Sequence, residues 1–250
     1  MWYWVWCCLL RFLPGESAPV KVKDAIDFGK VGLLGAGNLG SAVGYVLSLS
    51  GWAGQLHIID FQAFEKANLE TCISAHVQEV RVPLRKASAL AGIFVDHRIV
   101  ATERRCEVKR GEPLLGEKWD SFICAVDNPE TRLILDEVNA GFLINAGLGA
   151  NRYDAGWVFL TQHGPDHPTL SSIYKESTSE AGISDYVPEE FRDECSRMSY
   201  QGVSLALPFA GLAAGSLLVA GLYHQATGSR TKFSSIRMDL FAKQQKLTRL

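Results

Sequence analysis

The sequence predicts an α/β fold in which helices cover both faces of a mainly parallel sheet. From Lys30 to Gly147, short apolar segments of strand type alternate with segments of helical character. This alternation is typical of parallel sheets, because a helix usually forms the crossover between two parallel strands. The chain has 250 residues, of which 47% are hydrophobic, and this is ample for one core. We expect a single domain over residues 29–250, preceded by an N-terminal extension over residues 1–28.

The first predicted unit is a strand, a helix and a second strand. The apolar run VGLL at 31–34 precedes a glycine-rich turn, a helix over about 41–50 follows, and QLHIID at 55–60 forms the second strand. The later elements are a helix over about 86–93, a strand over 98–102, the buried strand SFICAVD at 121–127, a helix over about 129–140, the strands FLINAG at 142–147 and GWVFLTQ at 156–162, an apolar helix over 203–223 and a last strand near 236–241.

Residues 163–199 are polar and rich in Pro, Ser, Asp and Glu, which predicts a long surface loop inside the domain. The loop contains His163 and His167 in the run HGPDHP. Gly and Pro between the two histidines would break any helix that aligned them on a metal, so we interpret both as solvated loop residues.

Composition limits the partners and the compartment. Net charge is −2 without a dense basic patch, which disfavours a nucleic-acid partner. The six cysteines form no C-x-x-C pair, so the sequence indicates neither a zinc ribbon nor a disulfide framework, and a reducing cytoplasm fits best. The apolar run at 1–13 is too short to span a bilayer, and the run at 203–223 contains Pro208 and many small residues. We therefore predict a cytoplasmic protein with no membrane partner, whose apolar helix is buried in protein.

A glycine motif indicates a nucleotide site. Residues 35–40 read GAGNLG and fit the pattern G-x-G-x-x-G between a strand and a helix. Glycines at Gly35, Gly37 and Gly40 allow a tight turn and close approach of a phosphate to the backbone and to the helix N-terminus. Asp60 lies twenty residues beyond Gly40, where an acid commonly binds a ribose hydroxyl. At this point NAD, FAD and ATP all remain open.

Polar residues at the ends of the next strands favour a triphosphate. Asn68 follows the second strand, Lys86 begins the next helix, and Asp127 and Asn128 end the strand at 121–127. The carboxyl ends of parallel strands form one ligand crevice, so these side chains should meet there. A lysine beside phosphates and an acid beside Mg²⁺ suit ATP better than NAD. The structural alternative is that Asn68 and Asn128 cap helices, Lys86 is solvated and Asp127 is an N-terminal helix charge.

The segments at 35–71 and 125–150 resemble the two signatures of the ThiF/MoeB and ubiquitin-activating-enzyme superfamily, and ECSRMSYQGVSLALPFAGLAAGSLLVAGLYH is similar to its cysteine loop and buried helix. The resemblance implies a Rossmann-like adenylation fold and an enzyme that uses ATP and Mg²⁺ to adenylate the C-terminal carboxylate of a ubiquitin-like or sulfur-carrier protein. It implies nucleotide contacts at Gly35, Gly37, Asn38, Gly40, Asp60, Asn68, Lys86 and Asn128. It also implies a metal site at Asp127 and catalytic roles for Lys86, Asp127 and Cys195.

The resemblance also implies partners and a possible second step. Cys195 lies in the polar loop where many members carry the cysteine that accepts the acyl group as a thioester, before a downstream conjugating enzyme. Arg192 and Arg197 beside it would favour the thiolate; the alternative is a loop thiol without a chemical role. Cys72, Cys106 and Cys124 are interpreted as packing residues. A homodimer, or a heterodimer with a related subunit, is expected.

Three departures from the family pattern bear on activity. Thr71 stands where members usually have an arginine, Gln62 replaces the second acid of their Asp-x-Asp, and Gly37-Asn38 replaces Gly-Gly. We expect Arg81 or Arg85 to replace the missing arginine. The alternative is a non-catalytic partner subunit or adaptor. An NAD-dependent oxidoreductase is less favoured, because it would need a substrate domain with a proton-transferring His or Lys, and no such domain follows residue 150.

Overall fold

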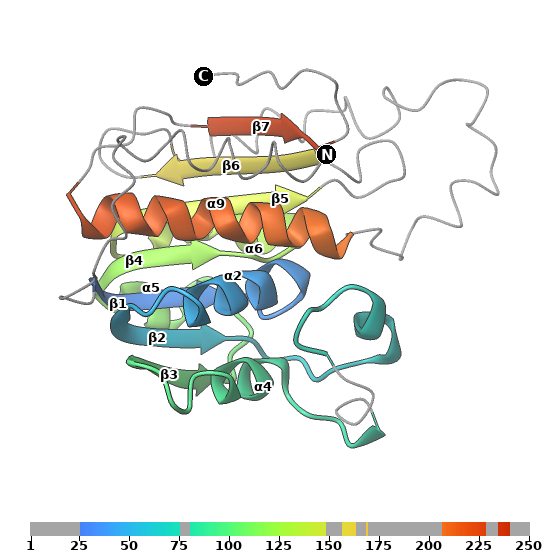
Figure 1. Cartoon of the computed structure of the whole chain (residues 1–250). Helices are drawn as coiled ribbons and strands as arrows, with labels where there is room; N and C mark the ends of the chain where they lie inside the picture. Colours follow the sequence, from blue (N-terminus) through green and yellow to red (C-terminus); the bar gives the residue numbers. More distant parts are fainter. Residues whose placement is uncertain are drawn as a thin grey trace, which may run out of the picture.

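The computed structural model describes residues 26–75, 81–148, 157–163, 169, 207–228 and 235–240. These residues build one seven-stranded sheet in the order β3-β2-β1-β4-β5-β6-β7 (Figure 1). The strands are β1 (Asp27–Leu34), β2 (Ala53–Ile59), β3 (Ile99–Arg104), β4 (Trp119–Cys124), β5 (Ala140–Leu148), β6 (Trp157–His163) and β7 (Ser235–Asp239). The first five strands in chain order pair in parallel, whereas β6 and β7 add on in antiparallel fashion. The mainly parallel α/β sheet predicted from the sequence is confirmed.

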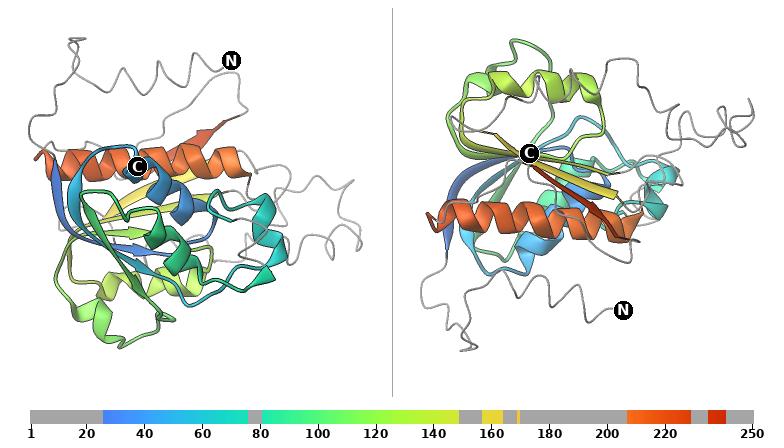
Figure 2. Two further views of the ribbon diagram at one scale, coloured as in Figure 1. Left: turned by 60° about the horizontal axis from the view of Figure 1, so that its bottom comes forward. Right: turned by 90° about the horizontal axis from the view of Figure 1, so that it is seen from above.

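Helices cover both faces of this sheet (Figure 2). They are α2 (Asn38–Ser48), α4 (Lys86–Gly92), α5 (Pro113–Gly116), α6 (Pro129–Leu133) and α9 (Pro208–Ala226), with the 3₁₀ turns η1 (Lys66–Glu70) and η2 (Leu135–Glu137). One core, between the sheet and α2, α4 and α9, joins residues such as Leu33, Leu47 and Leu218. A second core, beneath α5, α6 and η2, includes Leu34 and Leu115. Burial of apolar side chains on both faces stabilises the central strands, as it does in other parallel sheets.

Helix α9 is packed within the chain against α2 and the sheet. Its glycines allow the close approach: a Cβ added at Gly215 would lie 2.9 Å from the Cβ of Ala42, and one at Gly221 would lie 2.5 Å from Ile144. Pro208 occupies the first turn of the helix, where its missing N–H costs nothing. The predicted burial of this apolar segment in protein is therefore confirmed. None of the helices that the structure describes is long and apolar enough to cross a membrane.

Two predictions made from the sequence are wrong in detail. The single helix expected over 129–140 is split into α6 and η2 and ends at Glu137, since Asn139 bonds to other segments instead: its N–H donates to the Leu115 carbonyl and its carbonyl accepts from the Trp119 N–H. His163 is not a loop residue but the last residue of β6, where it is only 7% exposed and lies opposite Leu143. Its Nε2 is 2.9 Å from the hydroxyl of Thr161. His167 and most of the expected loop at 163–199 lie outside the described residues.

Candidate nucleotide-binding site

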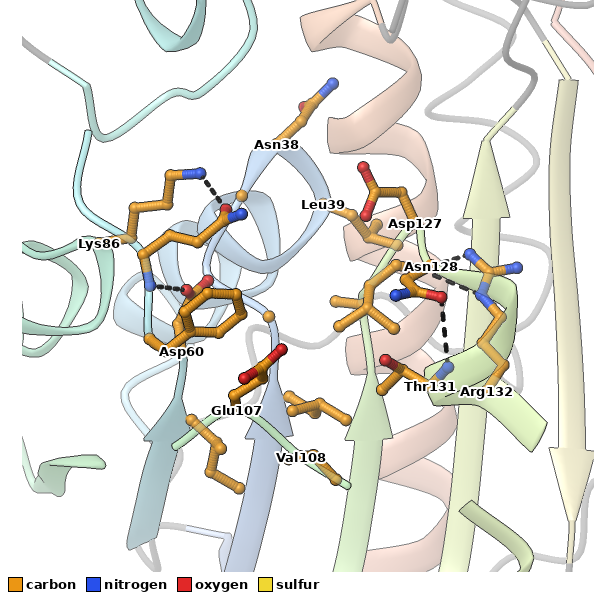
Figure 3. A pocket seen from close by; sticks show the side chains of 18 of the residues that line it. Asn38, Leu39, Asp60, Lys86, Glu107, Val108, Asp127, Asn128, Thr131 and Arg132 are labelled. Carbon is orange, nitrogen blue, oxygen red and sulfur yellow. Dashed lines mark hydrogen bonds between the residues drawn. The ribbon is translucent and has the colours of Figure 1, made fainter. Parts of the chain in front are cut away.

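A cavity of about 640 Å³ opens at the carboxyl ends of β1, β2 and β4 (Figure 3). Its wall also includes the start of α2, the segment around η1, the start of α4, the loop after β3, the start of α6 and the end of β5. Most residues predicted to bind the nucleotide or the metal line it: Gly35, Gly37, Asn38, Asp60, Asn68, Lys86, Asp127 and Asn128. The structure thus brings together residues that are up to 93 positions apart in the sequence (128 − 35).

The three glycines of the turn have different structural tasks. Gly35 has φ +92°, and its N–H donates to the Ile59 carbonyl at 2.9 Å. A Cβ at Gly40 would lie 1.9 Å from the Gly35 carbonyl oxygen, so both of these glycines are needed to form the turn itself. A Cβ at Gly37 would meet no atom within 4 Å, and Gly37 has φ −75°. The missing side chain of Gly37 therefore leaves open space where the chain borders the cavity.

Asp60 fastens the glycine turn to the end of β2. One carboxylate oxygen accepts the Ala36 N–H at 2.8 Å, and the other accepts the Gln62 N–H at 2.7 Å. Each oxygen has two lone pairs, so the carboxylate can still accept from a ligand hydroxyl while it holds the backbone. No side chain caps α2 at Gly37. The first N–H groups of a helix have no partner within the helix, and here they lie beside the cavity.

Lys86 is the buried cation of the cavity. Lys86 is only 7% exposed, and its ammonium donates to the side-chain oxygen of Gln62 at 2.7 Å. Figure 3 shows Lys86 and Asp127 on opposite sides of the same space. Asp127 is exposed and follows the end of β4. The cavity therefore presents an ammonium on one side and a carboxylate on the other.

The amide side chains also serve the local structure. The Asn68 oxygen accepts the Glu65 N–H at 2.9 Å and so caps η1, and the Asn128 oxygen accepts the Thr131 N–H at 3.4 Å at the start of α6. Asn38 packs against α9: its Nδ2 lies 3.5 Å from the Leu207 carbonyl, and a Cβ at Gly211 would lie 2.1 Å from its Oδ1. In Figure 3 the Asn38 side chain points away from the other labelled residues. The capping alternative for Asn68 and Asn128 thus describes contacts that exist, although both residues line the cavity.

Arg132 ties the ends of two strands together. Its guanidinium donates to the Val126 carbonyl at 3.0 Å and to the Ala146 carbonyl at 3.2 Å. It therefore supports the wall from which Asp127 projects. In the part of the chain that the structure describes, no cluster of three or more His, Cys, Asp or Glu side chains forms a metal cage. A site with one carboxylate suits Mg²⁺, which is commonly held by one or two carboxylates together with substrate phosphates.

The loop after β3 contributes residues that were not predicted from the sequence to line the site. Cys106, Glu107, Val108, Lys109 and Arg110 all line the cavity. Lys109 pairs with Glu107 at 2.8 Å and Arg110 pairs with Glu137 at 2.5 Å, and both cations are largely exposed. The sequence signal that could have identified them is their position: the run CEVKR follows a parallel strand, and the carboxyl end of that strand lies at the same edge of the sheet as the other site residues.

The expected substitutes for the missing arginine are not at the cavity. Thr71 lines it, as the sequence suggested, but Arg81 and Arg85 are not among the described residues around it. Arg85 precedes α4 and its backbone bridges to Ala63, and Arg81 is exposed. The cations that do line the cavity are Lys86, Lys109, Arg110 and Arg132.

The described cysteines have the properties of packing residues. Cys72 and Cys124 are buried, and burial raises the pKa of both thiols. The pKa of Cys106 is also raised, first by burial and then by the carboxylate of Glu112. Because the thiolate is the nucleophile, a raised pKa disfavours nucleophilic catalysis at these positions. Cys195, Arg192 and Arg197 lie outside the described residues.

Comparison with known proteins agrees with the fold. A family model described as the BilD C-terminal domain matches residues 29–229. No curated protein gave a significant match. The fold is similar to that of E. coli MccB with ATP, with a TM-score of 0.65, 16% identity, and coverage of 92% of this chain and 65% of MccB. The structure of MccB with AMPCPP and MccA gives a TM-score of 0.65 at 15% identity, covering 88% of this chain and 63% of MccB.

A second similar structure is PaaA, with a TM-score of 0.65, 15% identity, and coverage of 88% of this chain and 72% of PaaA. MccB and PaaA belong to the ThiF/MoeB-like adenylyltransferase superfamily, and the BilD C-terminal domain family, whose model matches residues 29–229, is related to it, so the resemblance proposed from the sequence is confirmed. The chain spans less than two thirds of the length of the MccB chains that it matches.

Proposed function

We propose that this chain, which belongs to the BilD C-terminal domain family, binds ATP and adenylates a carboxylate. The observation that carries the proposal is the single cavity that combines the open backbone at Gly37, the buried ammonium of Lys86 and the carboxylate of Asp127. An adenylating enzyme needs to hold a triphosphate, stabilise charge on the leaving pyrophosphate and position a metal, and each of these residues suits one of the tasks.

The residues around the cavity fit a nucleotide with Mg²⁺. The space in front of Gly37 would take a phosphate, which the first N–H groups of α2 would bind. Asp60, already oriented by two N–H groups, would accept a ribose hydroxyl. Lys86 would contact the phosphates, and Asp127 would hold Mg²⁺ together with phosphate oxygens. The bound metal would supply positive charge for the phosphates.

The proposed reaction transfers AMP to the substrate. A carboxylate oxygen attacks the α-phosphorus, the bond from that phosphorus to the pyrophosphate oxygen breaks, and pyrophosphate leaves with its electron pair. The products are an acyl-adenylate and pyrophosphate. Lys86 lies in a largely buried position, where its charge stabilises the leaving group more than it would in water. No proton transfer is required in this step, so it needs no general base.

For the substrate, we propose the C-terminal carboxylate of a ubiquitin-like or sulfur-carrier protein. The structures of MccB with MccA support a substrate partner of some kind for the fold. In this proposal the protein acts as a dimer in the cytoplasm, either with itself or with a related subunit. A downstream conjugating enzyme would then receive the acyl group from a thioester on Cys195.

The proposed thioester has its own test. Incubation with ATP, Mg²⁺ and the carrier protein should give an adduct that reductant removes. With Cys195→Ser, the adduct should become a reductant-stable ester or disappear while adenylate formation continues. An unchanged thioester in Cys195→Ala would assign the acceptor role to another cysteine or to a partner protein.

One observation favours the adaptor as a second candidate. Thr71 brings no charge to the cavity, and neither Arg81 nor Arg85 lines it. A non-catalytic subunit could retain the fold and the nucleotide site without turnover. An NAD-dependent oxidoreductase is the third candidate, and a comparison of nucleotides separates it from the other two: ATP with Mg²⁺ should raise the melting temperature, and NAD should not.

Pyrophosphate exchange tests the enzyme directly. Asp127→Ala should abolish ATP-dependent pyrophosphate exchange and leave the fold intact, because the Asp127 side chain is exposed and its removal exposes no core. Asp96→Ala is the matched control, since Asp96 is also exposed and does not line the cavity. Exchange at the wild-type rate in Asp127→Ala would remove the metal role of this residue. Binding of ATP without exchange in the wild type would favour the adaptor.

A further inference from the structure

The partner of Lys86 is a neutral amide, although the lysine is buried. The ammonium donates to the Gln62 side-chain oxygen at 2.7 Å, and it makes no ion pair with any acid in the described part of the chain. Asp60, the acid two residues before Gln62, uses its two oxygens to accept the N–H groups of Ala36 and Gln62. Among the described residues, therefore, no acid forms an ion pair with the Lys86 ammonium.

A buried charge is costly unless an opposite charge compensates it. The amide oxygen of Gln62 offers a hydrogen bond but no net charge. The Lys86 side chain borders the cavity, so an anion that enters the cavity can supply the missing charge. An ammonium held by a neutral amide attracts an anion more strongly than an ammonium already paired with a carboxylate does.

The Gln62 side chain has a defined orientation. Its backbone is held at both groups: the N–H donates to Asp60 at 2.7 Å, and the carbonyl accepts the Lys86 N–H at 3.1 Å. An ammonium can only donate, so the amide turns its oxygen toward Lys86 and its NH₂ group away from it. Because Gln62 lines the cavity beside Lys86, two kinds of donor, an ammonium and an amide, lie together at this wall.

We propose that Gln62 is a positioning and specificity residue for the polyphosphate part of the nucleotide. It holds the Lys86 ammonium in place without neutralising it and adds its NH₂ group as a second donor to the same phosphate. Thr71 and Gln62 line the same cavity, and in this proposal the neutral amide at 62 offsets the lack of a cation at 71. The inference rests on the proposed binding of ATP and specifies which part of the nucleotide this wall recognises.

The test compares ATP with AMP in calorimetric titrations of the whole chain. Gln62→Glu is nearly isosteric and places a carboxylate beside Lys86. The affinity for ATP should fall by about ten- to hundredfold, the range expected when a hydrogen bond to a charged group is lost. The affinity for AMP should change by less than about threefold, because AMP lacks the polyphosphate and feels only the weak, screened repulsion of the added carboxylate. Gln55→Glu, an exposed residue of β2 that does not line the cavity, is the control with the same change in net charge.

Each outcome decides the question. A selective loss of ATP affinity supports the role of Gln62, whereas an equal loss for ATP and AMP, or no loss, overturns it. If the wild type binds neither nucleotide, the proposed function fails and this inference fails with it. Should Gln62→Glu not fold, Gln62→Met removes both hydrogen bonds without adding charge, and it should again weaken ATP selectively.

A double-mutant cycle between positions 62 and 71 tests whether Gln62 acts through the charge of the site or only through the shape of the cavity wall. If the neutral amide offsets the missing cation, Thr71→Arg should recover most of the ATP affinity that Gln62→Glu loses, because the new arginine restores the positive charge. A residue that only shaped the wall would give additive effects in this cycle. If the effects of Gln62→Glu and Thr71→Arg on ATP affinity, each measured alone, simply add in the double variant, the compensation between positions 62 and 71 is refuted.

Discussion

Gly37 offers the sharpest test of where a phosphate binds, because its substitution separates binding from folding. Gly37→Ala adds one methyl group at a residue with φ −75°, a value that any residue adopts. The added Cβ would meet no protein atom within 4 Å. The fold should therefore keep its stability or gain about 0.4–1 kcal/mol, since alanine restricts the unfolded chain more than glycine does.

The same methyl group stands in the space through which a phosphate would approach the backbone. Loss of one hydrogen bond to a charged phosphate costs about 1.5–3 kcal/mol, which corresponds to about a ten- to hundredfold loss of ATP affinity. Calorimetric titration with ATP and Mg²⁺ measures this loss, and urea denaturation measures the stability. The expected result is a stable protein that binds ATP weakly.

Two further alanine variants serve as controls for Gly37→Ala. In Gly40→Ala the new Cβ would lie 1.9 Å from the Gly35 carbonyl oxygen, so this variant should lose stability as well as binding. In Gly92→Ala the Cβ would meet nothing within 4 Å, and Gly92 does not line the cavity, so binding should not change. ATP binding by Gly37→Ala as tight as in the wild type would mean that no phosphate approaches this backbone.

Two predictions concern stability. Hydrogen bonds from Arg104 and then Lys30 lower the pKa of Glu117 from 4.5 to about 2, so its stabilising effect is complete above pH 4.5 and is lost as the pH falls toward 2. Glu117→Gln should lower the free energy of unfolding by about 1 kcal/mol at pH 7, because the Lys30–Glu117 ion pair is about one third exposed. In urea denaturation, the difference in stability between this variant and the wild type should shrink near pH 2. Gly215→Leu should destabilise the α2–α9 contact by about 1–3 kcal/mol or more, because a Cβ at this position would already lie 2.9 Å from the Cβ of Ala42. A variant that melts at the wild-type temperature would contradict the tight packing.

The central strands could be located from the sequence because their signals are local. Buried parallel strands appear as short apolar runs, and the glycine turn and Asp60 mark where the first two of them end. The end of the helix expected over 129–140 depends instead on hydrogen bonds between Asn139 and the residues Leu115 and Trp119, which lie far from it in sequence. His163 was misplaced for a related reason, because its strand is defined by antiparallel pairing with β5.

The site was predictable in its location but not in all of its contacts. The carboxyl edge of a parallel sheet gathers strand-end residues whatever their separation, and this rule placed Asp60, Lys86 and Asp127 around one cavity. Proximity in sequence did not predict which cations would join them. Arg81 and Arg85 do not line the cavity, whereas Lys109 and Arg110 do. The loop of Lys109 is placed by the burial of Val108 in the core of Leu34 and Ile59, a long-range contact without a local signal.

The charges at the cavity distinguish a nucleotide-binding chain, whether enzyme or adaptor, from a chain that uses this fold only as a scaffold. Lys109 and Arg110 each have a carboxylate partner and are largely exposed, so the solvent screens them. Lys86 has neither a carboxylate partner in the described region nor contact with much solvent. A chain that used this fold only as a scaffold would gain stability from an apolar residue or an ion pair at this position. An uncompensated buried ammonium next to the open backbone of Gly37 is costly for folding alone, and it is useful where a bound polyphosphate provides the opposite charge.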